Sequence, residues 1–163
     1  MSLIPLRTLG ASAAAICLIT AGAAAQAPQG QPKVAQAASA SATPRTPAPR
    51  DAYVYIGWPV DGATVNGTHI KIWFGTRNFG VAPAGVTTRN TGHHHLLIDV
   101  PVPPLDQPIP NDRNHLHFGL GQTETVIELP PGKHTLQLLM GDADHVPHDP
   151  PLISKRITIY VRG

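Results

Sequence analysis

The sequence predicts an all-β domain, an immunoglobulin-like antiparallel β-sandwich, and three observations lead to this fold class. Short runs of β-branched and aromatic residues recur from residue 51 onward, and Gly and Pro separate them. No stretch carries a convincing helical period of 3.6 residues. The 18 prolines would interrupt most helices in any case, because proline lacks the backbone N–H that a helix needs.

Six segments are predicted as strands: 53–56, 69–74, 94–100, 124–129, 134–140 and 153–161. In the last segment, Ile157, Ile159 and Val161 alternate with more polar residues, so one face is expected to be buried and the other wet. The sequence Pro130-Pro131-Gly132-Lys133 predicts a turn tight enough to join segments 124–129 and 134–140 as a hairpin.

Residues 1–27 have the pattern of a secretory signal peptide. Arg7 precedes a small and apolar run, Leu9 to Ala25, which ends in Ala23-Ala24-Ala25-Gln26-Ala27, a site suited to signal peptidase. The apolar core is shorter than the roughly 20 residues that span a bilayer. We therefore expect a periplasmic or secreted protein whose mature form has no membrane span.

Residues 28–50 consist mainly of Ala, Pro, Gln, Ser and Thr. Such a segment buries too little apolar surface to offset the entropy of ordering it, so it is predicted to be a disordered linker. Residues 51–163 then form a single β-sandwich domain of ordinary size. The only cysteine, Cys17, lies in the predicted signal peptide, so the mature domain has no thiolate for disulfides, blue copper or iron–sulfur clusters.

The charge pattern argues against nucleic acid as a partner, because the formal net charge is only +2 and no basic stripe is present. Histidine is the unusual residue: there are nine, against 12 Lys plus Arg, and all lie in the predicted domain. In the run Gly92-His93-His94-His95, strand alternation places His93 and His95 on one face and His94 on the other, toward the core.

The predicted hairpin brings the start of segment 124–129 and the end of segment 134–140 to one end of the domain. Three histidine pairs are expected to converge there as metal ligands: His93, His95, His115, His117, His145 and His148. His69 and His134 begin strands at the opposite end and are predicted to be structural, with His134 capping the hairpin or bonding a backbone carbonyl. Trp58 and Trp73 are predicted to pack in the core or at a sheet edge.

The spacing and type of these residues suit a divalent transition metal. Histidines at i and i+2 of a strand lie about 6.6 Å apart on the same face, and zinc binds imidazole nitrogen at about 2.0–2.1 Å. Imidazole and carboxylate without thiolate favour copper or zinc. A single H-x-H pair on a strand is more often solvated than metal-bound. The loops 76–91 and 101–114 are long enough to suggest a function of their own.

Several strings resemble a family of exported bacterial domains known as domain of unknown function 4399. They are Gly92-His93-His94-His95-Leu96-Leu97-Ile98-Asp99, His115-Leu116-His117-Phe118-Gly119, Pro131-Gly132-x-His134-Thr135-Leu136, and Gly141-Asp142-x-x-His145-x-Pro147-His148. The resemblance covers nearly all of residues 53–161 and implies an exported, compact domain, but no activity. Pro59-Val60-Asp61-Gly62-Ala63-Thr64-Val65 has a weaker likeness to bacterial immunoglobulin-like modules, including periplasmic copper carriers. Those carriers use an amino-terminal histidine that this chain lacks.

Three functions follow as alternatives. The leading hypothesis is a periplasmic protein that binds copper or zinc for sequestration or delivery. A second is a metal-dependent hydrolase or redox enzyme, with Glu124 or Asp142 as general base; no nucleophile motif supports it, since Ser154 has no G-x-S-x-G context. A third is a metal-free envelope module that binds a protein or glycan through the loops 78–85 and 101–110.

Overall fold

The computed structural model describes residues 45–163, which form nine β-strands and no helix. The all-β prediction is therefore confirmed, whereas the immunoglobulin-like sandwich topology stays a prediction. The predicted signal peptide and most of the predicted linker lie outside the described residues. Within the described part, no helix is long and apolar enough to cross a membrane.

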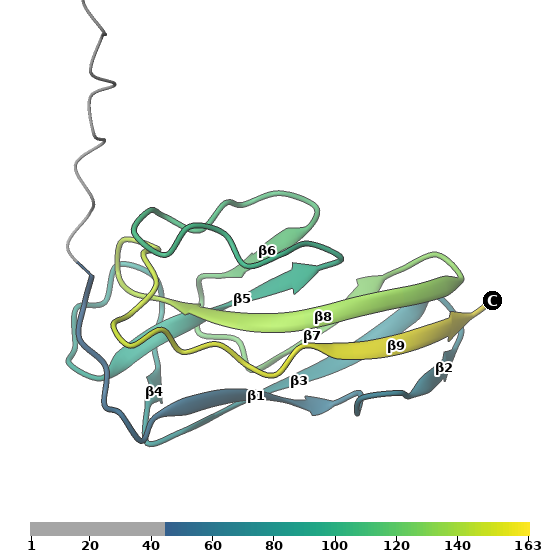
Figure 1. The fold of residues 1–163 in the computed structure, drawn as a ribbon, viewed down its shortest axis with the longest axis horizontal. Helices are drawn as coiled ribbons and strands as arrows, with labels where there is room; N and C mark the ends of the chain where they lie inside the picture. The colour runs from purple at the N-terminus through teal and green to yellow at the C-terminus, as the bar shows by residue number, and fades with distance from the viewer. Residues whose placement is uncertain (1–44) are drawn as a thin grey trace, which may run out of the picture. The chain divides into compact units, whose positions relative to one another are not determined.

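The nine strands make two sheets (Figure 1). They are β1 (Tyr53–Trp58), β2 (Thr64–Asn66), β3 (His69–Arg77), β4 (Gly80–Val81), β5 (Thr91–Ile98), β6 (His115–Phe118), β7 (Glu124–Glu128), β8 (Gly132–Gly141) and β9 (Ile157–Arg162). One sheet has the order β1-β3-β7, and the other has the order β2-β9-β8-β5-β4, in which β6 also pairs with β5. Most pairs are antiparallel, but β2 pairs with β9, and β4 with β5, in parallel.

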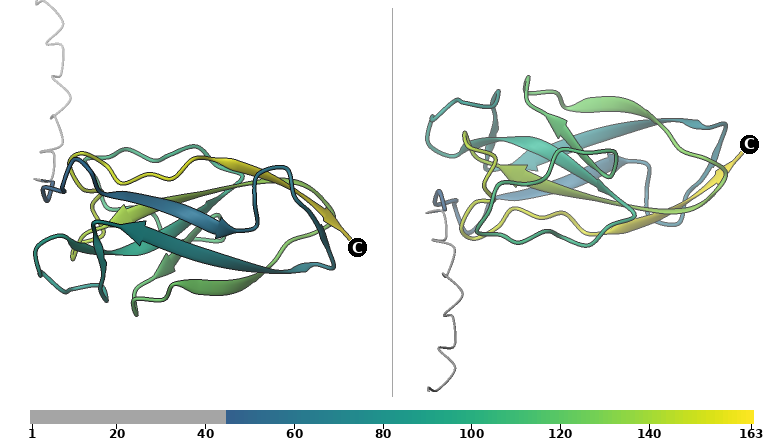
Figure 2. Two further views of the ribbon diagram at one scale, coloured as in Figure 1. Left: turned by 90° about the horizontal axis from the view of Figure 1, so that it is seen from below. Right: turned by 90° about the horizontal axis from the view of Figure 1, so that it is seen from above.

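The two sheets share one hydrophobic core, to which each contributes alternate residues. Ile70 and Ile72 of β3 face Leu136 and Leu138 of β8 and Ile159 of β9 in a single buried cluster. Figure 2 shows the two layers from opposite sides. This alternation is the reason that the sequence pattern of these strands predicts their buried faces.

The outer face of the three-stranded sheet is aromatic and exposed. Trp58 and Trp73 are 43% and 52% exposed, and Tyr53 and Tyr55 are exposed beside them on β1. The prediction that the tryptophans pack in the core or at a sheet edge is therefore wrong for Trp73, which is exposed on the central strand β3, whereas Trp58 lies on the edge strand β1. Trp73 lies on the solvent side of β3, between the buried residues Ile72 and Phe74.

The predicted hairpin between segments 124–129 and 134–140 is wrong, because β7 and β8 belong to different sheets. β7 pairs with β3, and this pairing continues through the bond from the Leu129 N–H to the Thr68 carbonyl. Two successive prolines, Pro130 and Pro131, then supply no N–H for a two-strand ladder. The chain crosses from one sheet to the other at this point.

His134 is held by two hydrogen bonds at this crossing. Its Nε2 lies 2.9 Å from the Pro130 carbonyl oxygen, as predicted, and its Nδ1 lies 2.7 Å from a carboxylate oxygen of Asp99. Asp99, which has a φ of +57°, also accepts the backbone N–H of Thr135. Although burial raises the pKa of Asp99, these hydrogen bonds outweigh it and hold the pKa below its usual value. His134 thus stabilises the connection between the sheets, which is a structural role and not that of a metal ligand.

Strand β5 is buried on both faces. Its inward residues Leu96 and Ile98 enter the main core, while Leu97 joins a second apolar cluster on the outer face with Leu139 and Ile109. The proline-rich segment 99–114 supplies Ile109 and folds across this outer face. The loop therefore acts as a cover over β5 and β8, and the candidate site lies beside it.

Residues 45–50, which fall in the predicted linker, form part of the folded domain. Pro47 makes a parallel β-bridge with Asp149, and the Ala48 N–H donates to the Asp149 carbonyl at 2.9 Å. The backbone N–H of Asp149 in turn donates to the Thr46 carbonyl at 2.9 Å. Ordered structure thus begins upstream of residue 51.

Candidate metal centre

Four of the six predicted histidine ligands form one cluster on the outer face of the six-stranded sheet. Alternation along β5 turns His93 and His95 to this face, and the antiparallel register of β5 and β6 sets His117 directly opposite His95. On the other side of β5, Gly141 of β8 lies opposite His93. His145 follows four residues later, in the loop that leaves β8.

The imidazole rings of the cluster are in mutual contact range. Ring centroids are 4.9 Å apart for His93 and His95, 5.0 Å for His95 and His117, and 4.9 Å for His93 and His117. The His145 ring lies 4.7 Å from that of His117 and 4.9 Å from that of His93. Within the first three residues, one ring nitrogen from each lies within 4.8 Å of the other two.

The nitrogens of the two β5 histidines face each other. His93 Nε2 and His95 Nε2 are 3.0 Å apart in a fully buried position. The Nδ1 atoms of both rings and Nε2 of His117 are buried without a hydrogen-bond partner among the described residues. Buried polar groups normally find a partner, so this cluster departs from ordinary protein interiors.

Two glycines make room for the rings. A Cβ on Gly119 would lie 2.3 Å from His117 Cε1 and 2.6 Å from its Nε2. A Cβ on Gly141 would lie 3.0 Å from His95 Nε2. A side chain at Gly119 would therefore displace the His117 ring, whereas one at Gly141 would require the His95 ring to shift by a few tenths of an ångström.

The loop that carries His145 is organised around the buried carboxylate of Asp142. One carboxylate oxygen accepts the backbone N–H groups of Asp144 and Val146 at 3.0 and 2.9 Å. His145 itself has a φ of +68°, a left-handed conformation that is uncommon for a non-glycine residue. Its N–H donates to the Asp142 carbonyl, and its carbonyl accepts the Ile109 N–H at 2.9 Å. These bonds hold a strained residue so that its ring points at the cluster.

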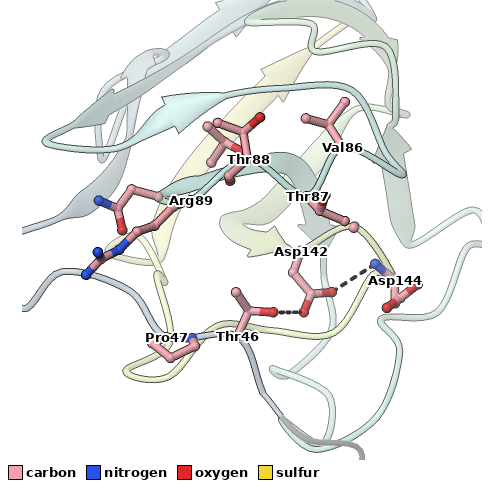
Figure 3. A pocket seen from close by; sticks show the side chains of 11 residues that line it. Thr46, Pro47, Val86, Thr87, Thr88, Arg89, Asp142 and Asp144 are labelled. Atoms are coloured by element: carbon pink, nitrogen blue, oxygen red, sulfur yellow. Dashed lines mark hydrogen bonds between the residues drawn. The ribbon is translucent and has the colours of Figure 1, made fainter.

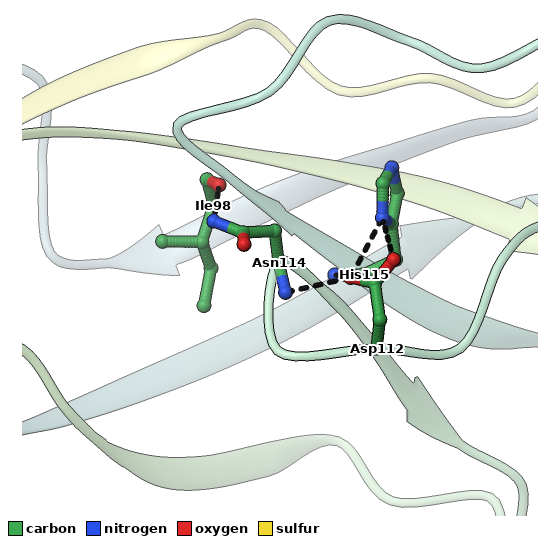
Figure 4. Close-up of polar contacts among 4 residues, drawn as sticks. All are labelled: Ile98, Asp112, Asn114 and His115. Carbon is green, nitrogen blue, oxygen red and sulfur yellow. Dashed lines mark hydrogen bonds and ion pairs between the residues drawn. The ribbon is translucent and has the colours of Figure 1, made fainter.

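His115 lies outside the cluster, although it shares a strand face with His117. Its Nδ1 is bound to the carboxylate of Asp112 at 2.9 Å, and the Asn114 side chain next to it donates to the Ile98 carbonyl (Figure 4). Its β5 partner is Leu97. The ring is thus engaged in closing the turn at residues 112–115.

His148 and His94 are buried but separate from the four-ring cluster. His148 packs edge-on against Phe79, with ring centroids 5.0 Å apart, and both of its ring nitrogens are without a partner among the described residues. His94 lies on the core face of β5, against Phe74, and its Nδ1 donates to the Gln122 carbonyl at 3.2 Å. The exposed His69 begins β3 and stands apart from the cluster.

The cluster favours neutral imidazole, the form that binds metals. Burial lowers the pKa of His93 to about 4, with further lowering by the charges of His145 and His117. Burial, with His93 as the main neighbour, lowers the pKa of His95 to about 2. The pKa of His117 is also lowered, first by burial and then by His145. The lone pairs of these rings are therefore available at neutral pH.

These shifts predict that the metal-free domain loses stability as the pH falls below 6.5. The unfolded chain takes up protons near the ordinary histidine pKa of 6.5, whereas His93 stays neutral in the folded state down to about 4 and His95 down to about 2. The unfolded state then binds more protons, so the free energy of unfolding falls from pH 6.5 toward pH 4. We expect a loss of a few kcal/mol, since one pKa unit corresponds to about 1.4 kcal/mol.

Urea unfolding in the presence of a chelator, at several pH values between 7.5 and 4, measures this loss. The same series on a His95→Leu variant separates the histidine contribution from that of carboxylates, and its pH dependence should be shallower. Parallel curves for the two proteins would contradict the assignment.

The sequence alone points to the histidines but not to the features that position them. Gly119 and Gly141 flank the ligand strands, and only their proximity to the rings distinguishes them from ordinary turn glycines. Asp142 stands in the sequence as a candidate base or orienting carboxylate; its structural role in the loop depends on backbone contacts that no spacing reveals.

A family model with the description "Domain of unknown function (DUF4399)" matches residues 72–162, more than half of the chain. The chain belongs to this family. A comparison with curated proteins found no match, and neither did a comparison with solved structures. The matched region contains all four histidines of the cluster, together with Asp142 and both glycines, but begins after the ordered residues 45–50.

Proposed function

We propose that this domain binds one divalent transition metal ion, copper or zinc, for sequestration or delivery outside the cytoplasm. The observation that carries the proposal is the buried facing of the His93 and His95 Nε2 atoms at 3.0 Å, with the His117 ring against both. Three imidazoles from two strands then supply ligands, and His145 supplies a fourth. His115 and His148, the other two predicted ligands, have no part in this set.

The geometry of the cluster supports metal binding without rearrangement of the backbone. Metal–nitrogen bonds of about 2.0–2.1 Å in a tetrahedron place the ligand nitrogens roughly 3.3 Å apart. The three nitrogens already lie within 4.8 Å of one another, so small ring rotations close the set. Imidazole ligands without sulfur suit copper(II) and zinc.

The energetics of the metal-free site support the same proposal. Six buried side-chain atoms among the described residues have no hydrogen-bond partner; all six are imidazole nitrogens, and three of them belong to His93, His95 and His117 of the cluster. Each buried, unsatisfied polar group costs about 1–3 kcal/mol. A cluster that only served the fold would be better made of leucines, whereas a ligand set must retain its lone pairs.

The enzyme alternative has weaker support because the candidate bases are engaged elsewhere. Glu124 is on the outer side of the three-stranded sheet, where it pairs with Lys71 at 3.1 Å. Both carboxylate oxygens of Asp142 accept hydrogen bonds. The Ser154 hydroxyl donates to the Lys155 carbonyl and accepts the Leu138 N–H. Among these groups none is free to activate water at the cluster.

The metal-free alternative also has weaker support at one of the two loops considered for it, residues 101–110. Ile109 is 4% exposed and packs into the outer apolar cluster, so the segment 101–110 is used as a cover over the sheet. Leaving several unpaired imidazoles in the buried region beside this cover has no evident benefit for a partner-binding module.

Titration of the mature protein with Zn²⁺ and Cu²⁺ tests the proposal. We expect one ion per chain and a rise in melting temperature that grows with metal concentration, since a ligand of the folded state stabilises it. His69→Ala, which removes an exposed histidine remote from the cluster, should bind like the wild type. No stoichiometric binding of either ion at micromolar concentration would overturn the proposal.

A further inference from the structure

The segment Arg45–Ala48 lies along the loop that carries His145 and is bound to it at several points. Arg45 donates from Nε to the Pro147 carbonyl at 3.0 Å, and its Nη2 donates to the His148 carbonyl. The β-bridge between Pro47 and Asp149 adds a backbone connection. We call residues 45–48 the strap.

One side-chain contact connects the strap to the organising carboxylate of the loop. The Thr46 hydroxyl donates to Asp142 Oδ2 at 2.6 Å, while the other carboxylate oxygen accepts the Asp144 N–H (Figure 3). Asp142 is only 6% exposed, so this bond satisfies an oxygen that is otherwise shielded from water. The strap also forms one wall of a cleft of about 440 Å³ whose opposite wall is the segment 86–91.

The same carboxylate determines where His145 points. Asp142 Oδ1 fixes the N–H groups on both sides of His145, and the Asp142 carbonyl accepts the His145 N–H at 3.0 Å. Without these bonds, a residue at a φ of +68° would relax toward a commoner conformation. The chain of contacts therefore runs from Thr46 through Asp142 to the His145 ring.

We propose that the strap regulates the metal centre: strap docking holds His145 in the ligand position, and a bound metal ion in turn holds the strap in place. This rests on the proposed function and assigns a control element to the same site. Thr46 and Asp142 are positioning residues that act through His145. By linkage, the effect of the strap on metal affinity equals the effect of the metal on strap docking.

The position of the strap in the chain indicates how a partner protein would act on this coupling. The strap precedes the family-matched region 72–162 and joins the folded domain to residues 1–44. The bridge between Pro47 and Asp149 is isolated from the named strands, so a partner that pairs its own extended segment with Asp149 would displace the strap. Displacement frees Asp142 Oδ2 and loosens His145, so metal release accelerates. The partner is thus expected to be an extended peptide segment of a protein that accepts the metal.

Metal release from the full mature chain tests the coupling. Transfer of bound Zn²⁺ to an excess of chromogenic chelator should be about tenfold faster from Thr46→Val than from the wild type, within the usual range of coupling between sites. Thr46→Ser retains the hydroxyl and should restore the wild-type rate. Arg50→Gln, which changes an exposed cation outside the strap, serves as the matched control.

Tryptic cleavage after Arg45 provides the reciprocal measurement. Saturating Zn²⁺ should slow this cleavage about tenfold in the wild type and have little effect in Thr46→Val. If the wild type binds zinc but Thr46→Val releases it at the wild-type rate, or zinc leaves cleavage unchanged, the strap coupling is overturned and the metal site stands. If the wild type binds neither zinc nor copper, both proposals are overturned.

Discussion

His95→Leu is expected to weaken zinc or copper binding by at least about 100-fold. His95 is one of the three closely grouped ligands, since its ring lies beside those of both His93 and His117, and its Nε2 faces His93 Nε2. Loss of groups that merely orient a ligand already costs 10–100-fold in metal affinity, so loss of the ligand itself costs more. Competition with a chelator of known affinity measures the change.

The control for this variant is the stability of its metal-free fold. Leucine joins Leu97 and Leu139 on the same sheet face, and it removes a buried Nδ1 that has no partner. The metal-free variant should therefore be as stable as the wild type or more stable in urea, while the metal-dependent rise in melting temperature disappears. His69→Leu should keep that rise. If His95→Leu binds metal as the wild type does, the cluster is not the ligand set.

Gly92→Ala is expected to destabilise the domain by about 3 kcal/mol, the range of severe overpacking in a well-packed site. A Cβ at this position would lie 2.5 Å from the Gly141 carbonyl oxygen and 2.8 Å from His148 Cε1. The first of these is backbone in the adjacent strand β8, which cannot yield without loss of the pairing next to His93. The midpoint of urea unfolding measures the effect.

Gly57→Ala is the matched control, since it makes the same change in β1. The added Cβ would approach Trp73 Cβ only to 3.7 Å, an ordinary contact. This variant should stay within about 1 kcal/mol of the wild type. Similar losses in the two variants would show that the close packing at Gly92 does not limit the stability of the domain.

The strand alternation around residues 93–95 could be predicted from the sequence because one face of β5 packs into the core and the other carries the histidine pair. His94 lies against Phe74 in the core, and His93 and His95 face outward together, as the period of two requires. The same reasoning predicted the buried residues of β9. Local periodicity is sufficient wherever a single strand determines which side chains share a face.

The convergence of distant histidines arises by a route other than the predicted one. The hairpin of β7 and β8 does not exist, yet β6 and β8 both pair antiparallel with β5, and their registers bring His117 and Gly141 beside the β5 histidines. Register and strand order depend on long-range pairing, which the pattern of one strand does not contain. The predicted topology therefore failed where the predicted grouping of residues partly succeeded.

The separation of His115 and His148 from the cluster also could not be predicted from the sequence. His115 has the same H-x-H spacing as His93 and His95, but the turn at residues 112–115 offers its ring a carboxylate partner. His148 is three residues from His145, and the left-handed conformation at His145 turns the chain between them. Competing local hydrogen bonds and backbone geometry, not residue type, decide which rings join the cluster.

The histidine triplet makes β5 intolerant of length changes. Insertion or deletion of a single residue in this strand would turn His94 outward and send His93 and His95 toward Phe74 and the interior of the domain. One mutational event would then remove two ligands from the metal centre and place two polar rings among hydrocarbon side chains. Gains and losses of residues in this protein should accordingly be confined to its connecting segments, with the spacing from Gly92 to Ile98 kept intact.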